Sequence, residues 1–223
     1  MYIKISVPGK IIISGEHAVV HGKPAIAAAV DRRLTVTLKS RADSKKIINT
    51  DANNNSLEKE AIKIAQSNLR GFELKIKSEI PVGAGMGSSA AIAVGVAAAL
   101  SVANLGESKL DLKKINDLAY KVETVQHGKA SGIDPTTVCF GGLIWFRKEL
   151  EFLKTIWKLQ FKVADKFNNF YIINTGKPYE TTGDMVKLVN DKLETSNSKI
   201  ATQNLFHEIE KQTKKIAIGL HGE

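Results

Sequence analysis

The sequence predicts an α+β fold, and three patterns favour that class. Short alternating runs typical of strands, such as residues 72–77, are mixed with longer runs typical of helices. Their order lacks the regular alternation of strand and helix that a doubly wound parallel sheet requires. An alanine-rich apolar run over residues 90–105 predicts a buried helix directly after a glycine-rich turn. This strand–glycine loop–helix unit therefore organises the predicted fold.

The N-terminal region predicts several strands. Residues 2–7 alternate between apolar and polar side chains, and Pro8-Gly9 is expected to end this first strand. Further strands are predicted over residues 10–14, 25–30 and 34–40. Residues 43–56 are polar, contain three consecutive asparagines and predict an exposed loop.

The rest of the chain predicts mainly helices, with three more strands. Helices are expected over residues 57–69, 111–127 with Asp111 as cap, 133–140, 179–194 and 199–218. Strands are expected over residues 143–146, 157–164 and 170–175. We expect two domains, residues 1–148 and residues 149–223, because the first set of elements ends near Lys148.

Composition excludes some classes of function. The 223 residues carry a formal net charge of +9, which suits an anionic ligand, but the lysines are scattered and only 6% of residues are aromatic. Cys139 is the single cysteine, so an intrachain disulfide or a thiolate metal cluster is excluded. The alternating N-terminus does not resemble a signal peptide, and residues 90–105 are too short and too rich in alanine for a membrane span. We therefore expect a cytoplasmic protein.

The glycine-rich turn predicts an anion site. Its glycines can adopt positive φ and let a ligand approach the backbone, and Ser88-Ser89 stand where the following helix begins. Helix N-termini attract anions, phosphate above all. The loop is not a Walker A loop, because no lysine follows Gly87, and it is not a dinucleotide fingerprint, because Ser88 stands at the third glycine. A turn that binds nothing is the alternative.

Two further stretches carry candidate polar residues. In residues 8–22, Lys10 follows a Pro-Gly turn, and Glu16-His17 follow a second turn. In residues 123–135, Glu123 and His127 share a helical face, and Asp134 follows a glycine turn. A carboxylate near a phosphate loop can bind Mg²⁺, and a second carboxylate can accept a hydroxyl proton. On composition alone, both groups also fit an ordinary solvated surface, and the spacing disfavours zinc.

Three stretches together resemble the GHMP small-molecule kinases. P-G-K-I-I-I-S-G-E-H-A-V-V-H-G resembles the first family motif, and its G-E-H-A-V-V part favours the mevalonate kinase branch over galactokinase. P-V-G-A-G-M-G-S-S-A-A resembles the family phosphate loop, with Met86 at a usual leucine. E-T-V-Q-H-G-K-A-S-G-I-D resembles the catalytic segment, with Ala130 where many members have proline. The motifs occur in the family order.

The resemblance implies roles for individual residues. It implies that the nucleotide phosphates are bound by Gly83, Ala84, Gly85, Met86, Gly87, Ser88 and Ser89. It implies that Ser89 and Glu123 bind Mg²⁺ and that Asp134 is the base toward the acceptor hydroxyl. Lys10 would stabilise Asp134 and the developing charge, and Glu16 and His17 would line the acceptor site together with them. The implied reaction transfers phosphate from ATP to mevalonate, in the mevalonate pathway of isoprenoid biosynthesis.

The resemblance also implies a two-domain architecture. The N-terminal domain would be similar to the second domain of ribosomal protein S5, and the C-terminal domain would be ferredoxin-like. Nothing after Gly142 resembles the late glycine-rich motif of the family, so we expect an incomplete second domain. The expected partner is a small-molecule substrate, with neither nucleic acid nor membrane, and a homodimer is left open.

Three alternatives remain at this point. One is another GHMP kinase, such as phosphomevalonate kinase, which a panel of acceptors would separate. A second is a nucleotide-binding module without turnover, because of the missing late motif. A third is a basic RNA-binding protein, since the S5-like fold also occurs in ribosomes. RNA binding would need none of Lys10, Ser89, Glu123 and Asp134.

Overall fold

The chain forms two compact units. The computed structural model describes residues 1–50, 56–105, 110–127, 130–160, 163, 170–176, 179–180 and 182–222. One unit comprises residues 1–10 and 29–141, and the other comprises residues 11–28 and 142–223. Strands β1 (Tyr2–Ser14) and β2 (Ala25–Arg41) each pass from one unit into the other. The sequence-based division into residues 1–148 and 149–223 remains a prediction.

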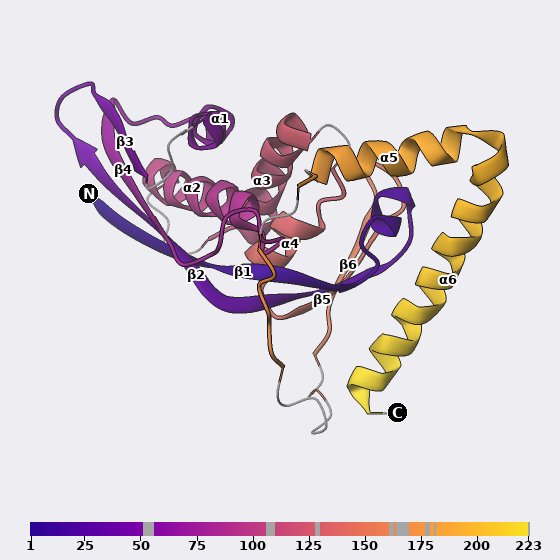
Figure 1. The fold of residues 1–223 in the computed structure, drawn as a ribbon. Helices are drawn as coiled ribbons and strands as arrows, with labels where there is room; N and C mark the ends of the chain where they lie inside the picture. Colours follow the sequence, from indigo (N-terminus) through magenta and orange to yellow (C-terminus); the bar gives the residue numbers. More distant parts are fainter. Residues whose placement is uncertain are drawn as a thin grey trace. The chain divides into compact units, whose positions relative to one another are not determined.

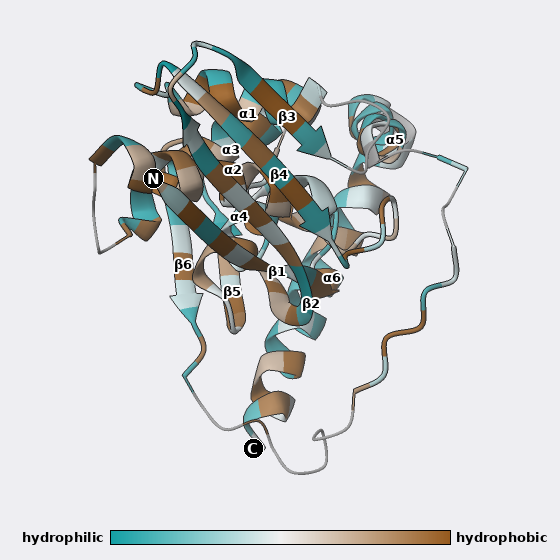
Figure 2. Ribbon diagram, turned by 90° about the vertical axis from the view of Figure 1, so that its left-hand side faces the viewer, coloured by the Kyte–Doolittle hydropathy of each residue, from teal (hydrophilic) through white to brown (hydrophobic). Residues whose placement is uncertain are grey.

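The sheet of the first unit is built around β2. The C-terminal half of β2 pairs antiparallel with β4 (Gly71–Ser78), with Val36 opposite Ile76 and Leu38 opposite Leu74. β4 in turn pairs in parallel with β3 (Lys46–Thr50), and β1 pairs with β2. Figure 2 shows the alternation of apolar and polar residues along β2 and β4. This alternation directs one face of each strand into the core.

Helices cover one face of this sheet. They are α1 (Ser56–Ala65), α2 (Ser88–Leu105), α3 (Leu112–His127) and α4 (Ile133–Phe140). Figure 1 shows α1, α2 and α3 on the same side of the strands. A Cβ on Gly95 of α2 would lie 2.7 Å from Cγ2 of Val36, so this glycine lets the helix approach the sheet closely.

The core of the first unit surrounds α2. It includes Leu34, Val36 and Leu38 of β2 and Phe72 and Leu74 of β4, all with no exposed surface, together with the buried alanines of α2. By length and composition α2 could also cross a membrane, but more than half of the tested stretch is buried inside the protein. It is the central helix of a packed core.

The second unit contains further paired strands and helices. The N-terminal end of β2 pairs antiparallel with β5 (Leu143–Lys148), with Ala27 opposite Ile144, and β5 pairs antiparallel with β6 (Lys154–Lys158). A short 3₁₀ helix, η1 (Ala18–His21), lies between β1 and β2 in sequence. Two helices end the chain, α5 (Thr182–Glu194) and α6 (Ser196–His221).

The α+β class and the predicted helices are confirmed. The apolar run after the glycine-rich turn is α2, and the structure begins this helix at Ser88. The predicted cap of α3 is also present, because Oδ1 of Asp111 accepts a hydrogen bond of 3.0 Å from the Lys114 amide. Helix ends differ from the predicted ends by a few residues, as expected for assignments from sequence.

The predicted break of the first strand at Pro8-Gly9 is wrong. β1 continues through both residues, and β2 likewise continues through the predicted gap between residues 30 and 34. Among the described strands β1 pairs with β2 alone, so a proline can stand in it without losing a ladder bond on its free side. A Cβ on Gly9 would lie 3.1 Å from the Met86 carbonyl oxygen, so this glycine serves close packing rather than a turn.

Two other predictions were wrong for non-local reasons. The predicted loop after residue 43 contains β3, whose residues pair with β4 across more than twenty positions of the sequence. The predicted strand over residues 170–175 is absent; within residues 170–176 the chain forms no strand, and Phe170, Tyr171 and Ile173 are exposed. A strand requires a partner, which the local pattern does not reveal.

Candidate active site

The glycine-rich loop is fixed at both ends by the core. Ile80 and Met86 are 3% and 6% exposed, whereas Gly83 and Gly85 between them are exposed. The three glycines of the loop adopt φ values between 70° and 75°, which confirms the predicted need for glycine. The Met86 side chain belongs to the core, so only its backbone is available to a ligand. The exposed part of the loop ends at the N-terminus of α2, where anions are favoured.

Lys10 connects this loop to the catalytic segment predicted from sequence. Its amide donates a hydrogen bond of 3.0 Å to the Met86 carbonyl oxygen. Its side chain runs past Gly87, where an added Cβ would come within 2.7 Å of Lys10 Cγ. Its ammonium nitrogen Nζ forms an ion pair of 2.9 Å with Oδ1 of Asp134. The Lys10 side chain is only 5% exposed, which rejects the interpretation of a solvated surface lysine.

Asp134 is held at the start of α4. It lies in the first turn of this helix, after Gly132, whose φ is 90°. Ser131 is 8% exposed, and its Oγ accepts a hydrogen bond of 3.3 Å from the Ile133 amide. A carboxylate in the first turn of a helix is favoured by the helix dipole. The Asp134 side chain is 30% exposed, so a substrate hydroxyl can reach it while Lys10 contacts it from the buried side.

The two predicted metal ligands lie on neighbouring helices. Ser89 is an exposed residue in the first turn of α2, and Glu123 lies in the second half of α3, which packs against α2. Oε2 of Glu123 is buried. Within the described part of the chain, no group of three or more His, Cys, Asp or Glu side chains could hold a metal ion by itself.

Glu16 and His17 belong to the second unit. They follow Gly15, where β1 has ended, and His17 precedes η1. Glu16 is exposed and His17 is partly buried. The φ of His17 is 60°, a conformation that side chains other than glycine rarely adopt. Such strain persists only where the surroundings enforce it, and it is common at functional sites.

Comparison with known proteins decides the family. Residues 55–142 match the family model described as the GHMP kinases N terminal domain. This range contains the glycine-rich loop, Glu123 and Asp134. The chain belongs to the GHMP kinase family.

Curated relatives with this GHMP kinase domain include archaeal mevalonate kinases. The mevalonate kinase of Thermococcus sibiricus is 38% identical over 176 residues, which cover 66% of this chain and 52% of the relative. That of Archaeoglobus fulgidus is 36% identical over 195 residues, which cover 82% of this chain and 62% of the relative. The chain thus spans between about half and three fifths of the length of these relatives.

Solved structures confirm the GHMP kinase fold. The mevalonate kinase of Methanococcus jannaschii superposes with a TM-score of 0.74 at 24% identity, covering 96% of this chain and 72% of that one. At this identity the similarity concerns the fold alone. The α+β fold predicted for a GHMP kinase is therefore confirmed.

The contact between Lys10 and Asp134, which the resemblance to GHMP kinases implied, is present as an ion pair. The sequence did not predict the contacts of Lys10 with Met86 and Gly87, which join the first motif to the glycine-rich loop. Burial raises the pKa of the Cys139 thiol to about 12, and its Sγ donates to the Leu112 carbonyl oxygen at 3.3 Å, a setting in which a thiol is inert.

Proposed function

We propose that this chain is a mevalonate kinase, which transfers the γ-phosphate of ATP to the 5-hydroxyl of mevalonate. The observation that carries the proposal is the ion pair of 2.9 Å between Lys10 and Asp134 beside the glycine-rich loop. Phosphoryl transfer depends mainly on positioning and on stabilising negative charge. One buried cation that contacts the loop and the acidic residue together suits that task. The similarity to archaeal mevalonate kinases supports this choice of acceptor.

The two residues of this ion pair have different proposed roles in phosphoryl transfer. Asp134 accepts, or orients, the proton of the acceptor hydroxyl. Lys10 holds the carboxylate through the ion pair and stabilises the charge that develops on the acceptor oxygen and the γ-phosphate. The nucleotide phosphates bind the backbone of the loop from Gly83 to Ser89, where exposed glycines adjoin a helix N-terminus.

The donor set fits Mg²⁺ as the cofactor that accompanies ATP. Mg²⁺ prefers oxygen ligands and is commonly bound through one or two carboxylates plus substrate phosphates, so a dedicated protein cage is not required. Ser89 offers a hydroxyl oxygen at the start of α2, and Glu123 offers a carboxylate on α3, which packs against α2. When bound, the ion would neutralise phosphate charge.

The acceptor side is assigned to Glu16 and His17. Their turn carries the strained backbone of His17 and lies within the motif that resembles the mevalonate kinase branch. We further propose a cytoplasmic enzyme whose partner is the small-molecule substrate.

An acceptor panel tests the proposal. The chain is incubated with ATP, Mg²⁺ and either mevalonate, phosphomevalonate or galactose, and ADP release is measured alongside ATP binding by calorimetry. We expect turnover with mevalonate above that with the other acceptors. Preference for phosphomevalonate would replace the proposed acceptor, and ATP binding without any turnover would identify a nucleotide-binding module.

A Glu123→Gln variant tests the metal assignment. Loss of one carboxylate should raise the Mg²⁺ concentration needed for ATP binding. Glu79→Gln, which changes a carboxylate outside the proposed ligand set, is the matched control. An unchanged Mg²⁺ titration would remove Glu123 from the ligand set.

A further inference from the structure

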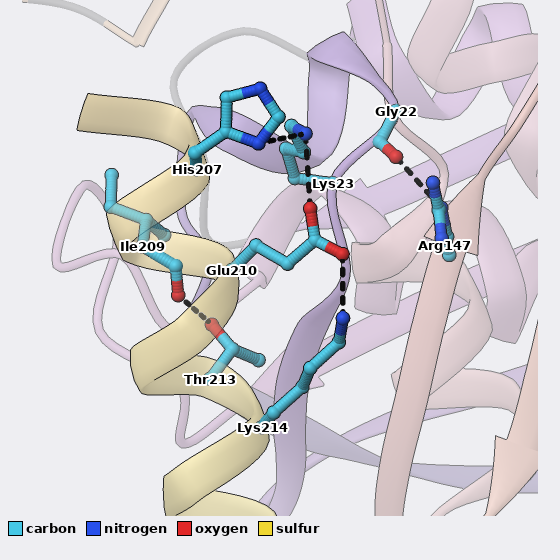
Figure 3. A network of polar contacts seen from close by, with 8 residues as sticks. All are labelled: Gly22, Lys23, Arg147, His207, Ile209, Glu210, Thr213 and Lys214. Carbon is cyan, nitrogen blue, oxygen red and sulfur yellow. Dashed lines mark hydrogen bonds and ion pairs between the residues drawn. The ribbon is translucent and has the colours of Figure 1, made fainter. Parts of the chain in front are cut away.

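The segment of residues 14–23, which carries Glu16 and His17, is held by α6. Three side chains of this helix contact it. Thr213 Oγ1 lies 2.8 Å from Ser14 Oγ, Glu210 Oε2 accepts from Lys23 Nζ at 3.0 Å, and the Phe206 ring stacks on His21 with ring centroids 4.9 Å apart. The contacts thus reach both ends of the segment, and Figure 3 shows the one between Glu210 and Lys23.

The three contacting residues share one face of α6. Phe206, Glu210 and Thr213 are separated by four and then three positions, the spacing that aligns side chains on a helix. Phe206 is 5% exposed and Thr213 is fully buried, with its hydroxyl also donating to the Ile209 carbonyl oxygen. This face of α6 therefore packs as a unit.

The Lys23–Glu210 pair is the most strongly charged of these contacts. Its side chains are 17% and 14% exposed, and Lys23 Nζ also lies 3.2 Å from Nδ1 of His207. Hydrogen bonds from Lys214 and Lys23 hold the pKa of Glu210 at about 2. Figure 3 shows Glu210 between the two lysines. Shielded, charge-assisted hydrogen bonds are stronger than neutral or exposed ones.

The segment itself requires an external support. His17 has a φ of 60°, and Gly15 has a φ of 93° where an added Cβ would lie 2.6 Å from Ala25 Cα. The segment closes tightly on the start of β2, and β5 adds a hydrogen bond of 2.8 Å from Arg147 Nε to the Gly22 carbonyl oxygen. A strained backbone of this kind relaxes when its contacts are removed.

We propose that α6 sets the conformation of segment 14–23 and that Glu210 is thereby a positioning residue for acceptor binding. The inference rests on the proposed function in assigning Glu16 and His17 to the acceptor. Glu210 touches Lys23, not the acceptor, and acts through the backbone between Lys23 and His17. Its loss should therefore weaken acceptor binding while the glycine-rich loop, in the other unit, keeps its affinity for nucleotide.

The test compares Glu210→Gln with Glu208→Gln in the full chain. Glu208 is the matched control, because its carboxylate, like that of Glu210, accepts two side-chain hydrogen bonds. Its donors, Lys211 and Gln212, both lie on α6 itself, so Glu208→Gln removes no contact with segment 14–23. Glu210→Gln should speed amide hydrogen exchange in segment 14–23 by about five- to tenfold and raise the KM for mevalonate by a similar factor. The KM for ATP should change less than twofold, and Glu208→Gln should resemble the wild type.

A second pair of variants separates positioning from general destabilisation. Lys23→Met should reproduce the effects of Glu210→Gln. Lys23→Arg keeps the charge and should retain the wild-type rate of amide hydrogen exchange and the wild-type KM for mevalonate. Equal behaviour of Glu210→Gln and Glu208→Gln, or equal rises in both KM values, would overturn the proposal.

The proposed function can fail separately. If the wild-type chain does not phosphorylate mevalonate, the acceptor assignment is wrong, and hydrogen exchange alone decides whether α6 sets the segment. Unchanged exchange in Glu210→Gln would then refute that role as well.

Discussion

The two ends of the first motif are held by different kinds of contact. At one end, Lys10 is buried and contacts Met86, Gly87 and Asp134, all of which lie within the three GHMP motifs. At the other end, segment 14–23 is held by α6, whose residues lie 187 and 199 positions away in the pairs with Lys23 and Ser14. The proposed charge-stabilising end is thus held by residues of the motifs themselves, and the proposed acceptor end depends on sequence outside them.

The largest expected effect comes from removing the ion pair at the Lys10 end of the first motif. Asp134→Asn keeps the shape of the side chain but removes the charge that pairs with Lys10. Turnover should fall by roughly 10²–10⁴-fold, because the proposed general base is lost, while ATP binding persists. Initial rates and calorimetry with ATP measure the two quantities. Asp31→Asn is the control, since that side chain is 91% exposed. Equal turnover in Asp134→Asn and wild type would remove Asp134 from the mechanism.

Two glycine substitutions compare the rigidity of segment 14–23 with that of the glycine-rich loop, which Lys10 contacts. Gly15→Ala should cost about 3–4 kcal/mol of unfolding free energy, because φ is 93° and the new Cβ would collide with Ala25. Gly85→Ala should cost only about 1 kcal/mol, because φ is 70° but no atom lies within 4 Å of the new Cβ. Denaturant unfolding measures both. Equal losses would mean that segment 14–23 is no more constrained than the exposed part of the loop.

A core substitution tests how the glycine-rich loop is anchored. Met86 is 6% exposed, so Met86→Ala should destabilise the protein by about 2–3 kcal/mol and weaken ATP binding as the loop loses its anchor. Met86→Leu conserves the volume and should cost less than about 1.5 kcal/mol. Thermal unfolding and ATP titration provide the measurements. Wild-type ATP affinity in a folded Met86→Ala protein would show that the loop is fixed in another way.

The smallest expected effect is the change with pH of the stability that Glu210 of α6 contributes. Because the pKa of Glu210 is about 2 in the folded protein and near 4.5 when unperturbed, its ionisation stabilises the fold above about pH 4.5. This contribution declines as the pH falls and is gone below about pH 2. The melting temperature of Glu210→Gln should therefore lie below that of wild type at pH 7 and approach it at pH 2.5. A difference independent of pH would assign the effect to packing instead of charge.

Sequence reasoning succeeded where a pattern is local. The buried helix after the glycine-rich turn, the positive φ of Gly83, Gly85 and Gly87, and the Asp111 cap each follow from adjacent residues. The three GHMP motifs also identified Lys10 and Asp134, whose contact the structure shows. Their chemical roles remain predictions.

Sequence reasoning failed where a partner distant in the sequence determines the local structure. Gly9 looked like a turn residue, yet it is a contact point for Met86. β3 forms because β4 is beside it, and residues 170–175 form no strand despite the apolar run over residues 170–173. The α6 residues Glu210 and Thr213 read as ordinary helix residues, because their partners on segment 14–23 cannot be read from their own neighbourhood.

The passage of β1 from one unit to the other has a consequence for synthesis of the protein. Every residue of the first unit lies within positions 1–141, so it can complete its core while the chain is still growing on the ribosome. Residues 11–28 emerge early, but the rest of their unit begins at residue 142 and includes α6 near the end. We therefore expect the first motif to fold in two stages: Lys10 packs first, and segment 14–23 adopts its final conformation once α6 has been synthesised.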